Sequence, residues 1–126
     1  MGAEAEALLH RYAEGRLDFF VPDLLFAEFA NVFWKAERCS RCDKRLTDIA
    51  IQTLVKHGFR TFRTSTLLDS AVGIARAYGR TVYDSVYIAL AVETKTQMIT
   101  ADQKLANALA THLPVVWLGA IHSRMQ

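Results

Sequence analysis

The feature that most constrains the fold is the stretch from Thr81 to Val92, TVYDSVYIALAV, which is apolar at almost every position. A helix that is apolar all round its surface belongs in the interior of a domain. Asp84, in the first turn of this predicted helix, is the exception. Burying a lone carboxylate is costly unless a partner compensates for it. Two interpretations stay open here: Asp84 caps the helix N-terminus, or it lines a polar cavity where several carboxylates hold a cation.

Length and composition are those of one globular domain without a membrane segment. The chain has 126 residues, 52% of them hydrophobic, which is enough for one core but small for an enzyme with two lobes. Charges recur throughout, so no apolar stretch reaches the ~20 residues that span a bilayer. The N-terminal sequence contains glutamates and lacks a basic region, so we do not expect a signal peptide. The net charge of +2 permits nucleic-acid binding without indicating it.

Two cysteines, Cys39 and Cys42, stand in a basic connection between two predicted helices. They fit a reducing, cytoplasmic location better than a disulfide framework. A zinc site needs about four ligands, and neither a second cysteine pair nor a close histidine pair follows, so we assign the pair no metal or redox role. A solvated helix–helix corner is favoured over a phosphate-contacting patch for the surrounding basic residues. These are Lys35, Arg38, Arg41, Lys44 and Arg45.

Short apolar strands alternate with helices of about a dozen residues, which predicts an α/β domain with a mainly parallel sheet. Thr47 is the predicted N-cap of the third helix, and Ser65 or Thr66 that of the fourth. Gly58 and Gly79 are predicted to end those two helices. We expect helices at residues 3–14, 22–38, 47–57, 65–79, 81–92 and 104–111, and strands at residues 19–21, 59–63, 97–100 and 115–118.

Three carboxylates stand where a purely structural role is awkward. Glu28 lies between Leu24 and Val32 on the apolar face of its predicted helix, although a glutamate at the margin of that face could also reach solvent. Asp102 follows the predicted strand at 97–100, at the carboxyl end where open α/β sheets bind ligands. Together with Asp84, these groups would repel one another unless a cation neutralised them. Hard carboxylate oxygens suit Mg²⁺ or Mn²⁺, so we hypothesise a shared metal site.

Three segments carry a resemblance to a known family, namely VPDLLFAEFANVFWKA (21–36), TVYDSVYIALA (81–91) and MITADQKL (98–105). With the order of helices and strands, they make nearly the whole chain similar to PIN-domain ribonucleases of the VapC-like group, the toxins of bacterial toxin–antitoxin pairs. The resemblance implies a three-layer α/β/α sandwich and Mg²⁺- or Mn²⁺-dependent endonucleolytic cleavage of RNA. It places the metal-binding and catalytic carboxylates at Glu28, Asp84 and Asp102, with Thr100 as a polar helper. It also implies a homodimer or higher oligomer, inhibited by a cognate antitoxin.

The chain departs from that family pattern at its N-terminus. The family begins with a mid-sheet strand that carries the first metal-binding aspartate, whereas only Met1 and Gly2 precede the first predicted helix here. Asp18 and Asp23 follow that helix and are not substitutes by position. Three functions therefore stay open: a ribonuclease whose activity this loss weakens or abolishes, a non-catalytic PIN-fold protein acting in dimer or antitoxin binding, and a generic α/β binding domain with helix caps and no metal. We further expect subunits to associate over the resulting gap, around Phe20, Phe29 and Ile99.

Overall fold

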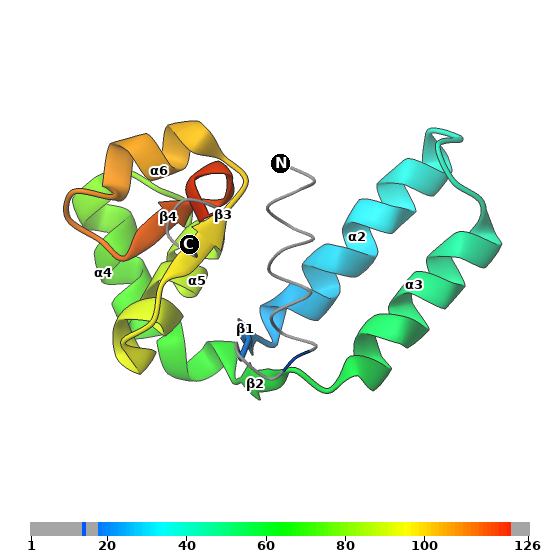
Figure 1. The fold of residues 1–126 in the computed structure, drawn as a ribbon, viewed down its shortest axis with the longest axis horizontal. Coiled ribbons are helices and arrows are strands. Elements are labelled where there is room, and N and C mark those ends of the chain that lie inside the picture. The colour runs from blue at the N-terminus through cyan, green and yellow to red at the C-terminus, as the bar shows by residue number, and fades with distance from the viewer. Residues whose placement is uncertain (1–13, 15–17, 122–126) are drawn as a thin grey trace.

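The structure, a computed structural model, describes residues 14 and 18–121 (Figure 1). The helix predicted at residues 3–14 falls outside this range except for its last residue. The elements in chain order are β1 (Phe20–Pro22), α2 (Leu24–Arg38), α3 (Lys44–His57), β2 (Arg60–Phe62), the 3₁₀ turn η1 (Thr64–Leu67), α4 (Leu68–Tyr78), α5 (Val82–Thr94), β3 (Met98–Thr100), α6 (Gln103–Leu109), β4 (Val115–Trp117) and the 3₁₀ turn η2 (Leu118–Ala120). None of the described helices combines the length and apolar character needed to cross a membrane.

The strands form two separate parallel pairs. β1 pairs with β2, with Val21 opposite Thr61, and β3 pairs with β4, with Ile99 opposite Val116. The predicted parallel direction is confirmed, whereas one continuous sheet is not formed by the described residues, because β1 and β3 are not hydrogen-bonded to each other. The three-layer arrangement therefore stays a prediction.

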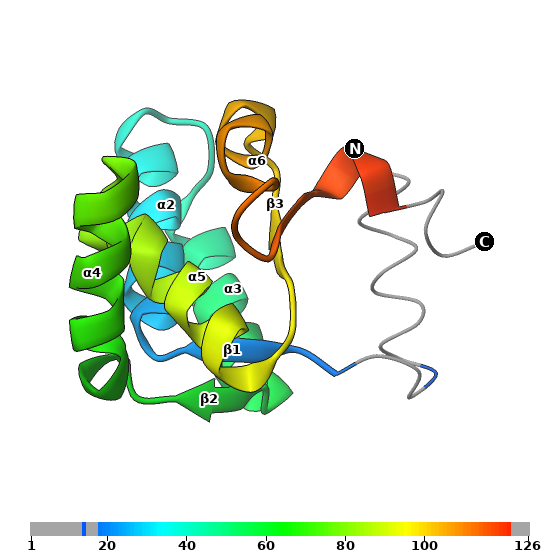
Figure 2. The same ribbon diagram turned by 90° about the vertical axis from the view of Figure 1, so that its left-hand side faces the viewer.

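Helix α5 lies at the centre of the core, as its apolar sequence predicts. Six of its residues are buried, namely Ser85, Val86, Ile88, Ala89, Leu90 and Ala91. Val86 packs with Leu67 and Ala71 on one side, where α4 lies alongside α5 (Figure 2). Ile88 packs with Leu105 of α6 and belongs to a second cluster that includes β4. The helix therefore joins the two strand pairs through side-chain packing.

Helices α2 and α3 form a hairpin that extends away from α4, α5 and α6 (Figure 1). No residue of α2 is buried, and Thr47 is the one buried residue of α3. Phe29 and Phe33 pack on each other with ring centroids 5.0 Å apart, while Val32 and Val55 are exposed. The apolar face of α2 is therefore only partly buried among the described residues, with Leu24 packed against the core.

Two predicted helix starts are also wrong. Asp43 caps α3, since the Leu46 amide donates to its carboxylate at 2.9 Å, and Thr47 lies inside the first turn. Ser65 and Thr66 lie in the 3₁₀ turn η1, and no side chain caps α4. The predicted ends are confirmed, because Gly58 and Gly79 take left-handed conformations with φ of 74° and 65°.

A long-range contact explains why the chain turns at η1. The Leu24 amide donates to the Thr64 hydroxyl at 3.0 Å, and the Thr64 amide donates to the Asp23 carboxylate at 3.0 Å. A hydrogen bond from the Thr64 side chain, above all, and the one from the Thr64 amide lower the pKa of the Asp23 carboxyl group. The start of α2 is thereby attached to the segment that follows β2.

Candidate functional site

Chain direction brings the three predicted carboxylates to one end of the strands. Helix α2 begins directly after β1, so Glu28 lies little more than a turn beyond the carboxyl end of that strand. Helix α5 packs on β1 and β3 and reverses into β3 through three residues, so its first turn, with Asp84, points back towards the carboxyl end of β3. Asp102 follows that same end. We call Glu28, Asp84 and Asp102 the acidic edge; it lies at the carboxyl ends of two parallel strand pairs, the end at which open α/β sheets bind ligands.

Asp84 is not the N-cap of α5, so the capping interpretation is wrong. Thr81 is the cap, because its hydroxyl accepts a hydrogen bond from the Asp84 amide at 3.0 Å. The Asp84 carboxylate is left half-buried in the first turn. There it benefits from the positive end of the helix dipole and remains available for another partner.

Tyr87 connects Glu28 to α5 and was not predicted from the sequence. Its hydroxyl donates to a Glu28 carboxylate oxygen at 2.5 Å, joining residues 59 positions apart. Tyr87 lies three residues after Asp84 on the same helix face. Burial, above all, raises the pKa of the Tyr87 phenol, followed by the hydrogen bond to Glu28 and the negative charges of Glu28 and Asp84. The tyrosine therefore stays protonated and holds the Glu28 carboxylate against α5. The sequence does not single out Tyr87, because a second tyrosine, Tyr83, lies in the same helix next to Asp84.

Asp102 and Thr100 form a local cap at the start of α6. The Asp102 carboxylate accepts from the Leu105 amide at 3.1 Å, and the Asp102 amide donates to the Thr100 hydroxyl at 3.0 Å. Asp102 is exposed, so it can still face a ligand from solvent. Its cap accounts for one carboxylate oxygen, and Thr100 orients the turn.

The described residues do not form a ready metal site. No three His, Cys, Asp or Glu side chains among residues 14 and 18–121 gather closely enough to hold an ion. The carboxylate oxygens of the acidic edge are suitable ligands for a hard cation. The three side chains do not, however, lie close enough together to bind one. Tyr87 binds one oxygen of Glu28, and the Leu105 amide binds one of Asp102. The acidic edge is therefore incomplete as a metal-ligand set.

Comparison with protein families identifies the chain. The family described as PIN domain matches residues 2–109. The chain belongs to the PIN-domain family. A comparison with curated proteins found no match. PIN domains have an α/β fold, are generally nucleases and typically use divalent metal ions. The α/β fold of the family agrees with the parallel strands of the structure.

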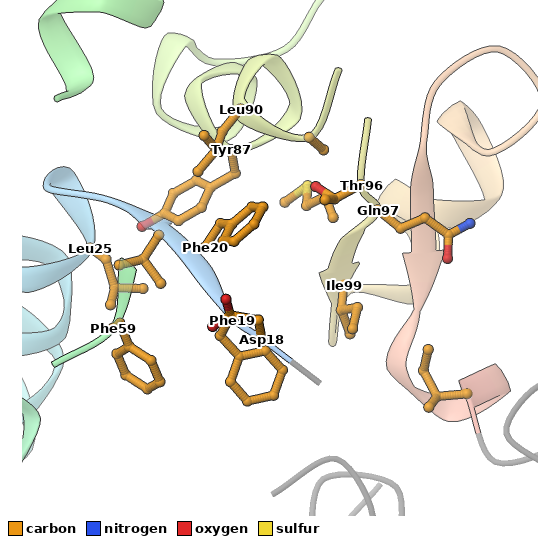
Figure 3. Close-up of a pocket in the computed structure, with 14 residues that line it drawn as sticks. Asp18, Phe19, Phe20, Leu25, Phe59, Tyr87, Leu90, Thr96, Gln97 and Ile99 are labelled. Atoms are coloured by element: carbon orange, nitrogen blue, oxygen red, sulfur yellow. The ribbon is translucent and has the colours of Figure 1, made fainter. Parts of the chain in front are cut away.

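An apolar groove separates the two strand pairs of this PIN domain (Figure 3). It has a volume of about 730 Å³ and is lined by residues of β1, β3 and α5, including Phe20, Ile99 and Tyr87. Tyr87 also binds Glu28, so this one side chain contacts both the groove and a residue of the acidic edge. Phe29 does not line it.

Backbone groups on both sides face this groove. The Asp23 amide donates to Phe62 and the Met98 amide donates to Pro114, each at 2.8 Å, so residues 23 and 98 point towards their partner strands. Peptide groups alternate in direction along a strand. Those of Phe20 and Ile99 therefore point into the groove, where no described strand pairs with them.

Proposed function

We propose that this PIN domain is a Mg²⁺- or Mn²⁺-dependent endoribonuclease of the toxin–antitoxin type. The observation that carries the proposal is the acidic edge at the carboxyl ends of β1 and β3, in a chain of a family whose members are generally nucleases. Glu28, Asp84 and Asp102 are its proposed metal-binding and catalytic carboxylates, and Thr100 supports Asp102. RNA is the proposed substrate, and a cognate antitoxin is the proposed inhibitor.

A second candidate function is a non-catalytic PIN-fold protein that acts in dimer or antitoxin binding. Two observations favour it: the described carboxylates form no three-ligand group, and the groove between β1 and β3 is open to another segment. An incomplete set of ligands binds a divalent ion weakly, so the two candidates differ in their response to metal.

The test is thermal unfolding of the full chain in Mn²⁺ up to millimolar concentration. A ligand that binds only the folded state raises stability by RT ln(1 + [L]/Kd). We expect a rise in the midpoint that appears only near millimolar Mn²⁺ and is lost in Glu28→Gln, Asp84→Asn and Asp102→Asn. Asparagine also caps helices, so the Asp102 change keeps the fold. Asp69→Asn, an exposed acid in the first turn of α4, should keep the rise.

Cleavage of a labelled single-stranded RNA, with Mn²⁺ or with EDTA, completes the test. Cleavage that needs Mn²⁺ and disappears in the same three variants supports the nuclease. A wild-type chain without any midpoint change at millimolar Mn²⁺ and without cleavage contradicts the nuclease and supports the non-catalytic candidate.

A further inference from the structure

The outer end of the α2–α3 hairpin concentrates the positive charge of the chain. Residues 34–45 contain five basic and two acidic side chains, a net charge of +3, whereas the whole chain carries +2. The rest of the molecule is therefore slightly acidic. We call this set the basic tip: Trp34, Lys35, Arg38, Arg41, Lys44 and Arg45, all of them exposed.

Most cations of the basic tip form no ion pair with a described residue. Of its five cations, only Lys44 has a recorded ion pair within the described part of the chain, with Asp48 at 3.9 Å, and both partners are exposed. Such a surface pair contributes little and is easily exchanged for another anion. The five exposed cations lie at the end of α2, in the loop after it and at the start of α3. They thus form a surface that can bind a polyanion.

An aromatic ring distinguishes the basic tip from a merely solvated corner. Trp34 is 50% exposed although it is among the largest apolar side chains. The Arg38 guanidinium lies 5.9 Å from the centre of its ring, within the range of a cation–π contact. An exposed indole beside cations is the arrangement on which bases of single-stranded nucleic acids stack while their phosphates meet Lys and Arg.

One cation of the basic tip, Lys35, is also aligned with Glu28 of the acidic edge. Lys35 lies seven residues after Glu28, which returns it to the same face of α2 about 10 Å further along the helix axis. A single strand lying along this face reaches from Lys35 to Glu28 within a few nucleotides.

We infer that the basic tip binds single-stranded RNA, with a base stacked on Trp34 and phosphates paired with the surrounding Lys and Arg side chains. This inference rests on the proposed function for the choice of RNA. An acidic protein segment could meet the cations, but its carboxylates would give Trp34 no planar ring to stack on.

The experiment measures binding of a fluorescently labelled single-stranded RNA by anisotropy, with the full chain in EDTA and at several salt concentrations. We expect binding at low salt, with quenching of tryptophan fluorescence. Trp34→Phe, which leaves Trp117 in place, should remove the quenching but keep part of the affinity. Trp34→Ala should weaken binding by about 5- to 150-fold, the range for loss of one stacked base.

The cations are tested through the salt dependence. Arg38→Gln and Arg41→Gln should each weaken binding and reduce the slope of log K against log[salt] by about 0.7, the value for one phosphate contact on a single strand. Arg76→Gln, an exposed arginine on α4, is the matched control and should change neither quantity. Circular dichroism checks that each variant is folded.

Three outcomes overturn the inference: no RNA binding at low salt, unchanged binding in both Trp34→Ala and Arg38→Gln, or equally tight binding of polyglutamate or duplex RNA without tryptophan quenching. Failure of the nuclease proposal is seen separately. A chain that binds RNA through Trp34 but never cleaves it with Mn²⁺ contradicts the nuclease and supports the RNA-binding tip.

Discussion

Tyr87 is the residue on which the arrangement of the acidic edge most depends. Glu28 belongs to α2, a helix without buried residues, so packing alone does not fix its side chain. The hydrogen bond from Tyr87 attaches it to α5, the most buried helix of the domain. A hydrogen bond to a charged group typically stabilises a protein by about 1.5–3 kcal/mol, and a half-buried one belongs at the lower end. Tyr87 is therefore a positioning residue for Glu28.

Tyr87→Phe should change how stability depends on pH. In the unfolded chain a tyrosine loses its proton near pH 10, whereas the raised pKa keeps Tyr87 protonated in the folded state. The contribution of Tyr87 is therefore complete below about pH 10 and lost as pH rises above it. Urea unfolding at pH 7 and at pH 10.5 should show wild type losing more stability than Tyr87→Phe. Tyr83→Phe, with Tyr83 62% exposed on the same helix, should behave like wild type. Equal losses in wild type and Tyr87→Phe would contradict the assignment.

The candidate site could be predicted from the sequence only in part. Glu28, Asp84 and Asp102 stand out because each interrupts an apolar pattern or follows a strand, which are local properties of the chain. The contact between Glu28 and Tyr87 depends on how α2 and α5 pack, and the sequence around either residue contains no information about it. The cap of α5 was missed because Thr81 and Asp84 are both good cap residues, and only backbone geometry decides between them.

At the scale of elements, the N-terminus of α5 contains both a helix cap, Thr81, and a residue of the acidic edge, Asp84. Thr81 satisfies the Asp84 amide, so it fixes the turn that holds the Asp84 carboxylate. Thr81→Ala should destabilise the protein by about 0.5–2 kcal/mol, the usual cost of losing an N-cap, and Thr81→Ser should restore most of it. Thr53→Ala, in which the lost hydroxyl bonds only to the Ile49 carbonyl within α3, should be nearly neutral. Urea unfolding measures all three variants. An unaffected Thr81→Ala variant would show that α5 is held by its buried face alone.

Most elements were predicted to within a few residues, and the exceptions have physical causes. Helix α5 was recognised from its unbroken apolar run, and glycines in left-handed conformations mark the ends of α3 and α4. The start of α3 was misplaced because Asp43 and Thr47 both suit an N-cap. The 3₁₀ turn η1 was missed because Thr64 is held by Asp23 and Leu24, some 40 residues earlier in the chain.

At the scale of the whole molecule, the two strand pairs share α5 as a packing partner but, among the described residues, are not hydrogen-bonded to each other. Strand pairing is a non-local property, so the sequence predicted the strands and their direction but not the interruption between β1 and β3. Direct closure of β1 onto β3 is not adopted in the described part of the chain. Instead an apolar groove separates them, and backbone groups of Phe20 and Ile99 face it. Exposed strand edges of this kind readily pair with another chain.

We therefore predict that the chain associates into a dimer or higher oligomer that covers the groove. Ile99 is 38% exposed although it lies mid-strand and lines the groove, so covering it removes apolar surface from water. Ile99→Glu places a charge in that interface and should weaken self-association on the order of tenfold or more. Val55→Glu, at an exposed residue of α3 that does not line the groove, is the matched control and should leave association unchanged. Sedimentation velocity at low micromolar concentration measures both. A well-folded wild-type monomer at that concentration would contradict the prediction. Equal effects of the two variants would show that the interface lies on a surface other than the edges of β1 and β3.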